Sequence, residues 1–214
     1  MSKLPGSPPR LVLASASPAR RRLLEAAGID AEVQVSGVDE STVDASRADT
    51  LCLALARLKA DAVAQRRQTD DLVLGCDSVL EFDGRILGKP ADHGEAIERW
   101  LSMCGRSGVL YTGHCLIAPG SGPGGGTHAE GVAKTTVHFA TPTDDEIAAY
   151  VASGEPLHVA GAFTIDGLGG PFVEWIEGDH SNVIGLSLPL LRQLLAELGI
   201  PITCLWRKQL ASGT

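Results

Sequence analysis

The stretch LVLASASPARRRLL, residues 11–24, decides the fold. Its first three residues predict a short buried strand, and small residues then turn the chain. Ser17 and Pro18 are a favoured N-cap and first residue of a helix, which we expect to run to about Ala27 before Gly28 stops it. A strand, a turn and a helix N-terminus with arginines in its first turn direct N–H groups and positive charge to one point, which is how proteins hold phosphate. Any single one of these arginines could instead be a solvent-exposed residue of the helix that binds no phosphate.

Strand and helix patterns alternate along the rest of the chain, which favours an α/β architecture. Asp83-Gly84 between two short apolar runs predicts a hairpin. Residues 119–128 are glycine-rich and predict a flexible hairpin loop rather than a phosphate cradle. The other predicted helices are 49–66, 92–103, 143–152 and 187–198, and the other predicted strands are 31–35, 72–76, 79–82, 85–87, 107–118 and 131–139.

Composition excludes several classes of protein. The chain of 214 residues has a formal charge of −8 and only 4% aromatic residues, whereas nucleic-acid binding needs basic excess or stacking aromatic side chains. No apolar run approaches the length of a membrane helix. The five cysteines have no CxxC spacing, so neither a disulfide framework nor a zinc site is favoured. We therefore expect a cytoplasmic protein that binds neither nucleic acid nor membrane.

Charged residues elsewhere form further candidates for a site. Asp39-Glu40 lies in a predicted loop. Such a pair of carboxylates is usually solvated on the surface, unless another carboxylate joins it to bind a cation such as Mg²⁺. Asp77 follows an apolar strand, where a carboxylate could ligate a metal or take a proton from water, or simply begin a turn. In the predicted helix 49–66, an apolar stripe is formed by Leu51, Leu55, Leu58 and Ala62, and Lys59 lies beside this stripe. With Lys89 and Arg20 it would suit a triphosphate, although a lone lysine is usually solvated.

Nucleophilic chemistry finds no support in the sequence. There is no Gly-x-Ser-x-Gly motif, and no cysteine has an obvious histidine partner. The six histidines share no spacing, so we interpret them as structural or surface residues.

Taken together, these clusters resemble the Maf family of nucleotide pyrophosphatases. The matching blocks are Leu-Ala-Ser-Ala-Ser-Pro (13–18) with Arg20, Asp39-Glu40, Ala56-Arg-Leu-Lys-Ala60, Gly75-Cys-Asp-Ser78, Asp83-Gly84, Leu87-Gly-Lys-Pro90, Tyr111-Thr-Gly113, Glu155-Pro156, Ala160-Gly-Ala162, Ile176-Glu-Gly-Asp179 and Asn182-Val-Ile-Gly185. They span nearly the whole chain, and their co-occurrence in this order is far more specific than any one of them.

The resemblance implies an elongated mixed β-sheet flanked by helices, related to inosine triphosphatase-like proteins. It implies one domain over residues 1–214, with two lobes around a central cleft. It also implies cleavage of a nucleoside triphosphate to a monophosphate and pyrophosphate, with Mg²⁺ or Mn²⁺. The site residues that it implies are Asp77 as proton acceptor, Glu40 and Asp77 as metal ligands, and Ser15, Arg20, Lys59 and Lys89 as phosphate-binding residues.

The family has a pyrimidine-type and a 7-methylguanosine-type subfamily, and three positions depart from the patterns of both, which leaves the preferred base an open question. Ala19 stands where the family carries Arg or Trp, Ser78 where it carries Thr or Gln, and Asp166 where it carries Gln or Glu. The small Ala19 side chain should leave a roomier pocket, so we expect tolerance of several bases, a preference for modified nucleotides, or recognition of one base through Asp166. A homodimer is a further prediction. Two other functions stay open, namely a nucleotide-binding regulator of septum formation and a broader hydrolase that releases phosphate stepwise.

Overall fold

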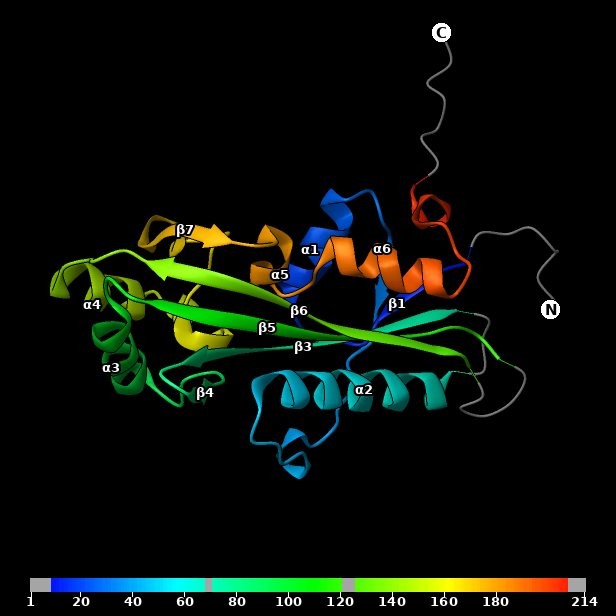
Figure 1. Cartoon of the computed structure of the whole chain (residues 1–214), viewed down its shortest axis with the longest axis horizontal. Helices are drawn as coiled ribbons and strands as arrows, with labels where there is room; N and C mark the ends of the chain where they lie inside the picture. The colour runs from blue at the N-terminus through cyan, green and yellow to red at the C-terminus, as the bar shows by residue number, and fades with distance from the viewer. Residues whose placement is uncertain (1–8, 68–70, 121–125, 208–214) are drawn as a thin grey trace, which may run out of the picture.

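The computed structural model describes residues 9–67, 71–120 and 126–207. It is an elongated mixed sheet flanked by helices (Figure 1), which confirms the predicted α/β class. The strands are β1 (Leu11–Leu13), β2 (Ala31–Val33), β3 (Leu72–Phe82), β4 (Arg85–Leu87), β5 (Ser107–Ile117), β6 (His128–Phe139) and β7 (Val173–Glu177). The α-helices are α1 (Pro18–Ala26), α2 (Ala48–Arg66), α3 (His93–Met103), α4 (Asp144–Ala152), α5 (His180–Ile184) and α6 (Leu188–Glu197).

Strand β3 is unpaired, among the described residues, along the middle of one of its edges, which leaves a gap in the sheet there. The strand order is β2-β1-β3-β5-β6-β7, with β4 also paired to β3. β5 pairs along residues 73–81 of β3, so β1, paired at residues 72–74, and β4, paired at residues 80–82, share the opposite edge. Within the described part of the chain, no strand pairs with residues 75–79 on that edge. The gap spans about 20 Å between the two flanking strands.

Helices cover both faces of the long strands (Figure 1). α2 lies along one face, α1, α5 and α6 lie on the other, and α3 and α4 pack at the end remote from β1. The two largest apolar clusters lie towards opposite ends of the sheet: one around Leu13, Leu74 and Leu194, the other around Leu80, Trp100 and Phe139. The gap in β3 therefore lies between the two clusters.

Local signals in the sequence act as expected at several element ends. The Ser17 hydroxyl accepts from the Arg20 N–H at the start of α1, and Gly28 follows the helix with φ +75°. Asp83 and Gly84 both have positive φ, as the tight turn between β3 and β4 requires.

The structure corrects some element boundaries. The predicted strands 72–76 and 79–82 form one continuous strand, β3, because the polar pair in its middle is held by partners on both faces. Strand β6 begins at His128, inside the predicted loop 119–128, and residues 121–125 of that loop lie outside the described residues. β7 and α5 were not predicted. None of the helices in the described ranges combines the length and apolar character needed to cross a bilayer.

Candidate active site

Arg20 is the centre of the first half of the site. It lies in the first turn of α1 and is 9% exposed. Its Nε donates to the Gly185 carbonyl at 2.6 Å, its Nη1 to Ser15 Oγ at 3.1 Å and its Nη2 to Ser78 Oγ at 3.0 Å. The guanidinium is therefore fixed on three sides at the gap, as a preorganised anion-binding group would be.

The turn after β1 and the end of α5 create this arrangement. Ser15 Oγ also accepts from the Ser17 N–H at 3.1 Å, which closes the turn before the helix. Gly185 has φ +119°, and a Cβ there would lie 3.2 Å from Arg20 Nε. Glycine is needed at position 185 because the backbone conformation is left-handed and the arginine passes close to it.

Lys59 is the centre of the second half of the site. Its Nζ lies 2.5 Å from Asp77 Oδ1 and 2.9 Å from Glu40 Oε1. Lys59 and Asp77 are buried, whereas Glu40 is exposed in a 3₁₀ turn, Glu40–Thr42. One ammonium thus joins a buried carboxylate of β3 to a carboxylate of the loop before α2.

Lys59 reaches Asp77 because α2 packs unusually close to the sheet. A Cβ on Gly75 would lie 2.1 Å from the Ala56 carbonyl, and a Cβ on Gly113 would lie 2.3 Å from the Cys52 carbonyl. Both contacts are with helix backbone, so only glycine permits this approach.

The buried face of α2 differs from the predicted stripe. It is formed by Ala48, Cys52, Leu55, Ala56, Lys59, Ala60 and Val63. Lys59 therefore lies on this face rather than beside it, because Asp77 offers it a buried anionic partner.

Asp77 is not at the end of a strand, as the sequence analysis expected, but in the middle of β3. Neighbouring residues of a strand point to opposite faces, so Asp77 meets α2 while Ser78 meets α1. The two halves of the site therefore lie on opposite faces of β3 and meet at its unpaired edge.

The remaining predicted site residues lie around this core. Ala19 is half-buried on α1, next to Arg20. Asp166 lies 3.9 Å from the exposed Arg22, so the loop after residue 162 reaches the first turns of α1. Lys89 is exposed after β4 and, within the described ranges, makes no hydrogen bond or ion pair. The structure thus gathers Ser15, Arg20, Ser78, Lys59, Asp77 and Glu40 and leaves Lys89 apart.

The thiol next to Asp77 does not compete with it for chemistry. Cys76 is fully buried, and this burial raises the pKa of its thiol to about 12. The thiol stays protonated at neutral pH, so it is not a nucleophile.

His114 joins β5 to the start of α6 and has a defined tautomer. Its Nδ1 lies 3.0 Å from the Thr112 carbonyl, which can only accept, and its Nε2 accepts from the Ser187 N–H at 2.9 Å. Burial lowers the pKa of His114 to about 4. A second proton would put N–H on Nε2, facing the N–H of Ser187.

This histidine should make the stability of the protein depend on pH. The pKa of His114 is lower in the folded than in the unfolded chain, so the folded protein favours the neutral imidazole. The free energy of unfolding is therefore highest above pH 6.5 and decreases as the pH falls from 6.5 towards 4, where the unfolded chain binds a proton and the folded chain does not. The loss expected from His114 is about 3 kcal/mol. Urea unfolding at pH 7 and pH 4.5 measures it, and His114→Gln should be less stable at pH 7 but show a shallower pH slope. Equal slopes in both proteins would contradict the prediction.

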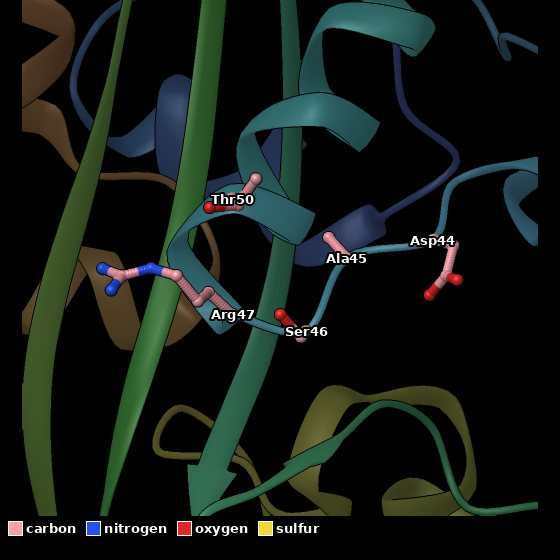
Figure 2. A pocket seen from close by; sticks show the side chains of 5 residues that line it. All are labelled: Asp44, Ala45, Ser46, Arg47 and Thr50. Carbon is pink, nitrogen blue, oxygen red and sulfur yellow. The ribbon is translucent and has the colours of Figure 1, made fainter.

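A separate pocket opens at the start of α2, lined by Asp44, Ala45, Ser46, Arg47 and Thr50 (Figure 2). Arg47 is paired with Asp49 at 2.5 Å, and this hydrogen-bonded guanidinium lowers the pKa of Asp49 to about 2. None of the predicted site residues lines this pocket.

The sequence did not point to two groups that contribute to the site. The Gly185 carbonyl binds Arg20, and the Thr112 hydroxyl lies 2.9 Å from Ser78 Oγ. Both residues belong to motif blocks quoted above, and this membership was the one indication in the sequence that they contribute to the site. A backbone carbonyl has no residue-type signature, and a threonine in a strand is ordinary β-sheet composition.

Comparison with known proteins identifies the family. The model of the Maf-like protein family matches residues 10–198. A nucleoside triphosphate pyrophosphatase of Salinispora tropica is 68% identical over 205 residues, covering 94% of this chain and 89% of that protein. One of Streptomyces coelicolor is 61% identical over 198 residues, covering 92% and 94%. A solved HAM1 protein from Coxiella burnetii aligns with 88% of this chain and 99% of its own, at 18% identity and a TM-score of 0.41. The resemblance seen in the motifs is therefore confirmed: this chain belongs to the Maf-like protein family.

Proposed function

We propose that this protein hydrolyses nucleoside triphosphates to nucleoside monophosphates and pyrophosphate at the gap between β1 and β4. The observation that carries the proposal is the buried Lys59–Asp77 pair, which adjoins the fixed guanidinium of Arg20 at that gap. The names of the two relatives given above, at 68% and 61% identity, support the same reaction.

Asp77 is the proposed proton acceptor. Its Oδ1 is held by Lys59, which leaves the second carboxylate oxygen for a water molecule at the open edge of β3. A positioned carboxylate that takes a proton from water as it attacks phosphorus is a general base. Lys59 fixes the orientation of the carboxylate that does this.

Cations on both faces of β3 are the proposed phosphate-binding groups. Arg20 and Lys59 lie at the gap, and Ser15 lies in the turn between β1 and α1. Lys89 follows β4, which flanks the gap on the side opposite β1. These charges suit the negative charge of a triphosphate, and the α1 dipole adds to them. Binding there would stabilise charge in an in-line displacement.

A divalent cation, Mg²⁺ or Mn²⁺, fits the donor set. Glu40 and Asp77 both direct a carboxylate oxygen at the same ammonium, so two oxygen ligands already converge on one positive charge. Mg²⁺ in phosphate-transfer sites is commonly held by one or two carboxylates, with water and substrate oxygens completing its shell. Glu40 and Asp77 would hold it, and it would neutralise charge on the phosphate oxygens.

Removal of the cation is expected to stop the reaction. With excess EDTA, pyrophosphate release should fall by at least about 100-fold, since the metal contributes several kcal/mol of charge stabilisation. Excess Mg²⁺ or Mn²⁺ should restore it. The measurement is pyrophosphate release with and without chelator, and full activity in EDTA would contradict the role of the cation.

Product analysis tests the reaction itself. One nucleoside monophosphate and one pyrophosphate should appear for each triphosphate consumed. Orthophosphate with a diphosphate intermediate would instead indicate stepwise removal of phosphate and overturn the proposal.

We propose that base preference is broad and that Ala19, Ser78 and Asp166 are the residues that determine it. The small Ala19 leaves room on α1, and Asp166 lies 3.9 Å from Arg22 of the same helix. A panel of ribo- and deoxyribonucleoside triphosphates tests this. Turnover of dTTP and UTP alone would contradict a broad preference.

A cytoplasmic location is also proposed, because all five cysteines are free thiols, as in a reducing compartment. A homodimer stays a prediction, which light scattering of the purified protein would check.

A further inference from the structure

A chain of hydrogen bonds starts at Arg20 and ends inside the protein. Arg20 Nη2 lies 3.0 Å from Ser78 Oγ, Ser78 Oγ lies 2.9 Å from Thr112 Oγ1, and Thr112 Oγ1 lies 3.3 Å from the Asn182 carbonyl. Ser78 and Thr112 are opposite each other in the β3–β5 register, so both side chains point to the face that α1 and α5 cover. Thr112 has no exposed surface.

All three contacts can be hydrogen bonds at once with only one arrangement of the two hydroxyl protons. The Asn182 carbonyl can only accept, so the single proton of Thr112 points to it. The Ser78 proton must then point to Thr112, and a lone pair of Ser78 is left to face the guanidinium. Thr112 thus ensures that Arg20 meets an acceptor and not a competing O–H donor.

The far end of the chain is also fixed. The Asn182 amide is fully buried and donates to the Leu110 carbonyl at 3.2 Å and to Thr135 Oγ1 at 3.0 Å. Three residues later, Gly185 accepts from Arg20 Nε. Arg20, Ser78, Thr112 and the segment 182–185 therefore form a closed ring.

We propose that Thr112 is a positioning residue that orients the phosphate-binding guanidinium of Arg20 by fixing the proton of Ser78. The proposal rests on the proposed function, in which Arg20 binds phosphate. Threonine suits the position because its branched Cβ restricts χ1 in a strand and holds the hydroxyl in one place. Valine has nearly the same shape without the hydroxyl, and serine keeps the hydroxyl without the branch.

The test measures binding of inorganic tripolyphosphate by titration calorimetry, together with kcat and KM for pyrophosphate release. Thr112→Val should weaken tripolyphosphate binding and raise KM, each by about tenfold, because a charge-assisted hydrogen bond loses its fixed acceptor. Thr112→Ser should stay within about threefold of the wild type, since it retains the donor to Asn182.

A double-mutant cycle separates this role from a merely structural one. If Thr112 acts through Ser78, then Thr112→Val should cost no further affinity in a Ser78→Ala background, whereas two independent losses would multiply. Multiplying losses, or Thr112→Val with wild-type affinity and only a lower melting temperature, would overturn the inference. So would a wild type that does not bind tripolyphosphate.

Binding of tripolyphosphate tests the role of Thr112, whereas release of pyrophosphate tests the proposed reaction. A wild type that binds tripolyphosphate but releases no pyrophosphate would refute the proposed function and leave the binding cycle as the test of Thr112.

Discussion

Asp77→Asn is expected to lower pyrophosphate release by about 10³-fold, because asparagine cannot accept the proton of the attacking water. The amide has the same shape and its oxygen can still accept from Lys59 Nζ, which also keeps its contact with Glu40. We therefore expect a folded protein that, with Mg²⁺ kept in large excess to offset the weaker amide ligand, has a KM that changes far less than its kcat. Initial rates of pyrophosphate release over a range of nucleotide concentrations give both constants.

Asp49→Asn is the matched control for Asp77→Asn. Asp49 is paired with Arg47 in the first turn of α2 and lies outside the proposed site, so its variant should keep wild-type turnover. If Asp77→Asn retained more than about a tenth of the wild-type kcat, a base that contributes at least about 10² would be excluded. The same variant separates catalysis from regulation: a cellular effect that persists without turnover would favour the regulator of septum formation.

Gly75→Ala is expected to have the largest effect on stability. Its Cβ would meet the Ala56 carbonyl at 2.1 Å, and a helix backbone cannot swing aside as a side chain can. The cost should be about 3 kcal/mol, which corresponds to about 6–12 °C in the melting temperature of a domain this size. α2 would have to move away from the sheet and take Lys59 from Asp77, so turnover of the folded fraction should also fall.

Gly88→Ala controls for the general effect of replacing a glycine. In the part of the chain that the structure describes, no atom lies within 4 Å of a Cβ built at position 88, so the melting temperature of this variant should stay close to that of the wild type. Calorimetry of both variants provides the comparison. A Gly75→Ala protein that melts like Gly88→Ala would show that the contact between α2 and β3 is not tight in solution.

Local chemistry made parts of the fold predictable from sequence. Ser17 and Pro18 begin α1, and Asp83-Gly84 forms the hairpin, because capping and positive φ depend on a few neighbouring residues. Arg20 was predictable for the same reason, since its place in the first helical turn follows from the cap.

Long-range contacts made other parts unpredictable. Asp77-Ser78 interrupts an apolar run and so resembles the end of a strand, yet Lys59 and Arg20 satisfy the two side chains and β3 continues. Lys59 was placed beside the buried face of α2 because a hydrophobic pattern does not count a paired lysine. Strand β7 is short and largely exposed and carries two glutamates, so the sequence has no clear strand pattern there, and pairing with β6 is what forms the strand.

The unpaired edge of β3 also bears on how the protein avoids misassembly. An open strand edge is a template for strands of other molecules, and charged side chains that point inwards are a common protection against this. Lys59 and Asp77 are such charges at the gap. The residues that we assign to turnover would thus also keep the protein soluble, and an apolar residue at position 77 should promote aggregation where asparagine does not.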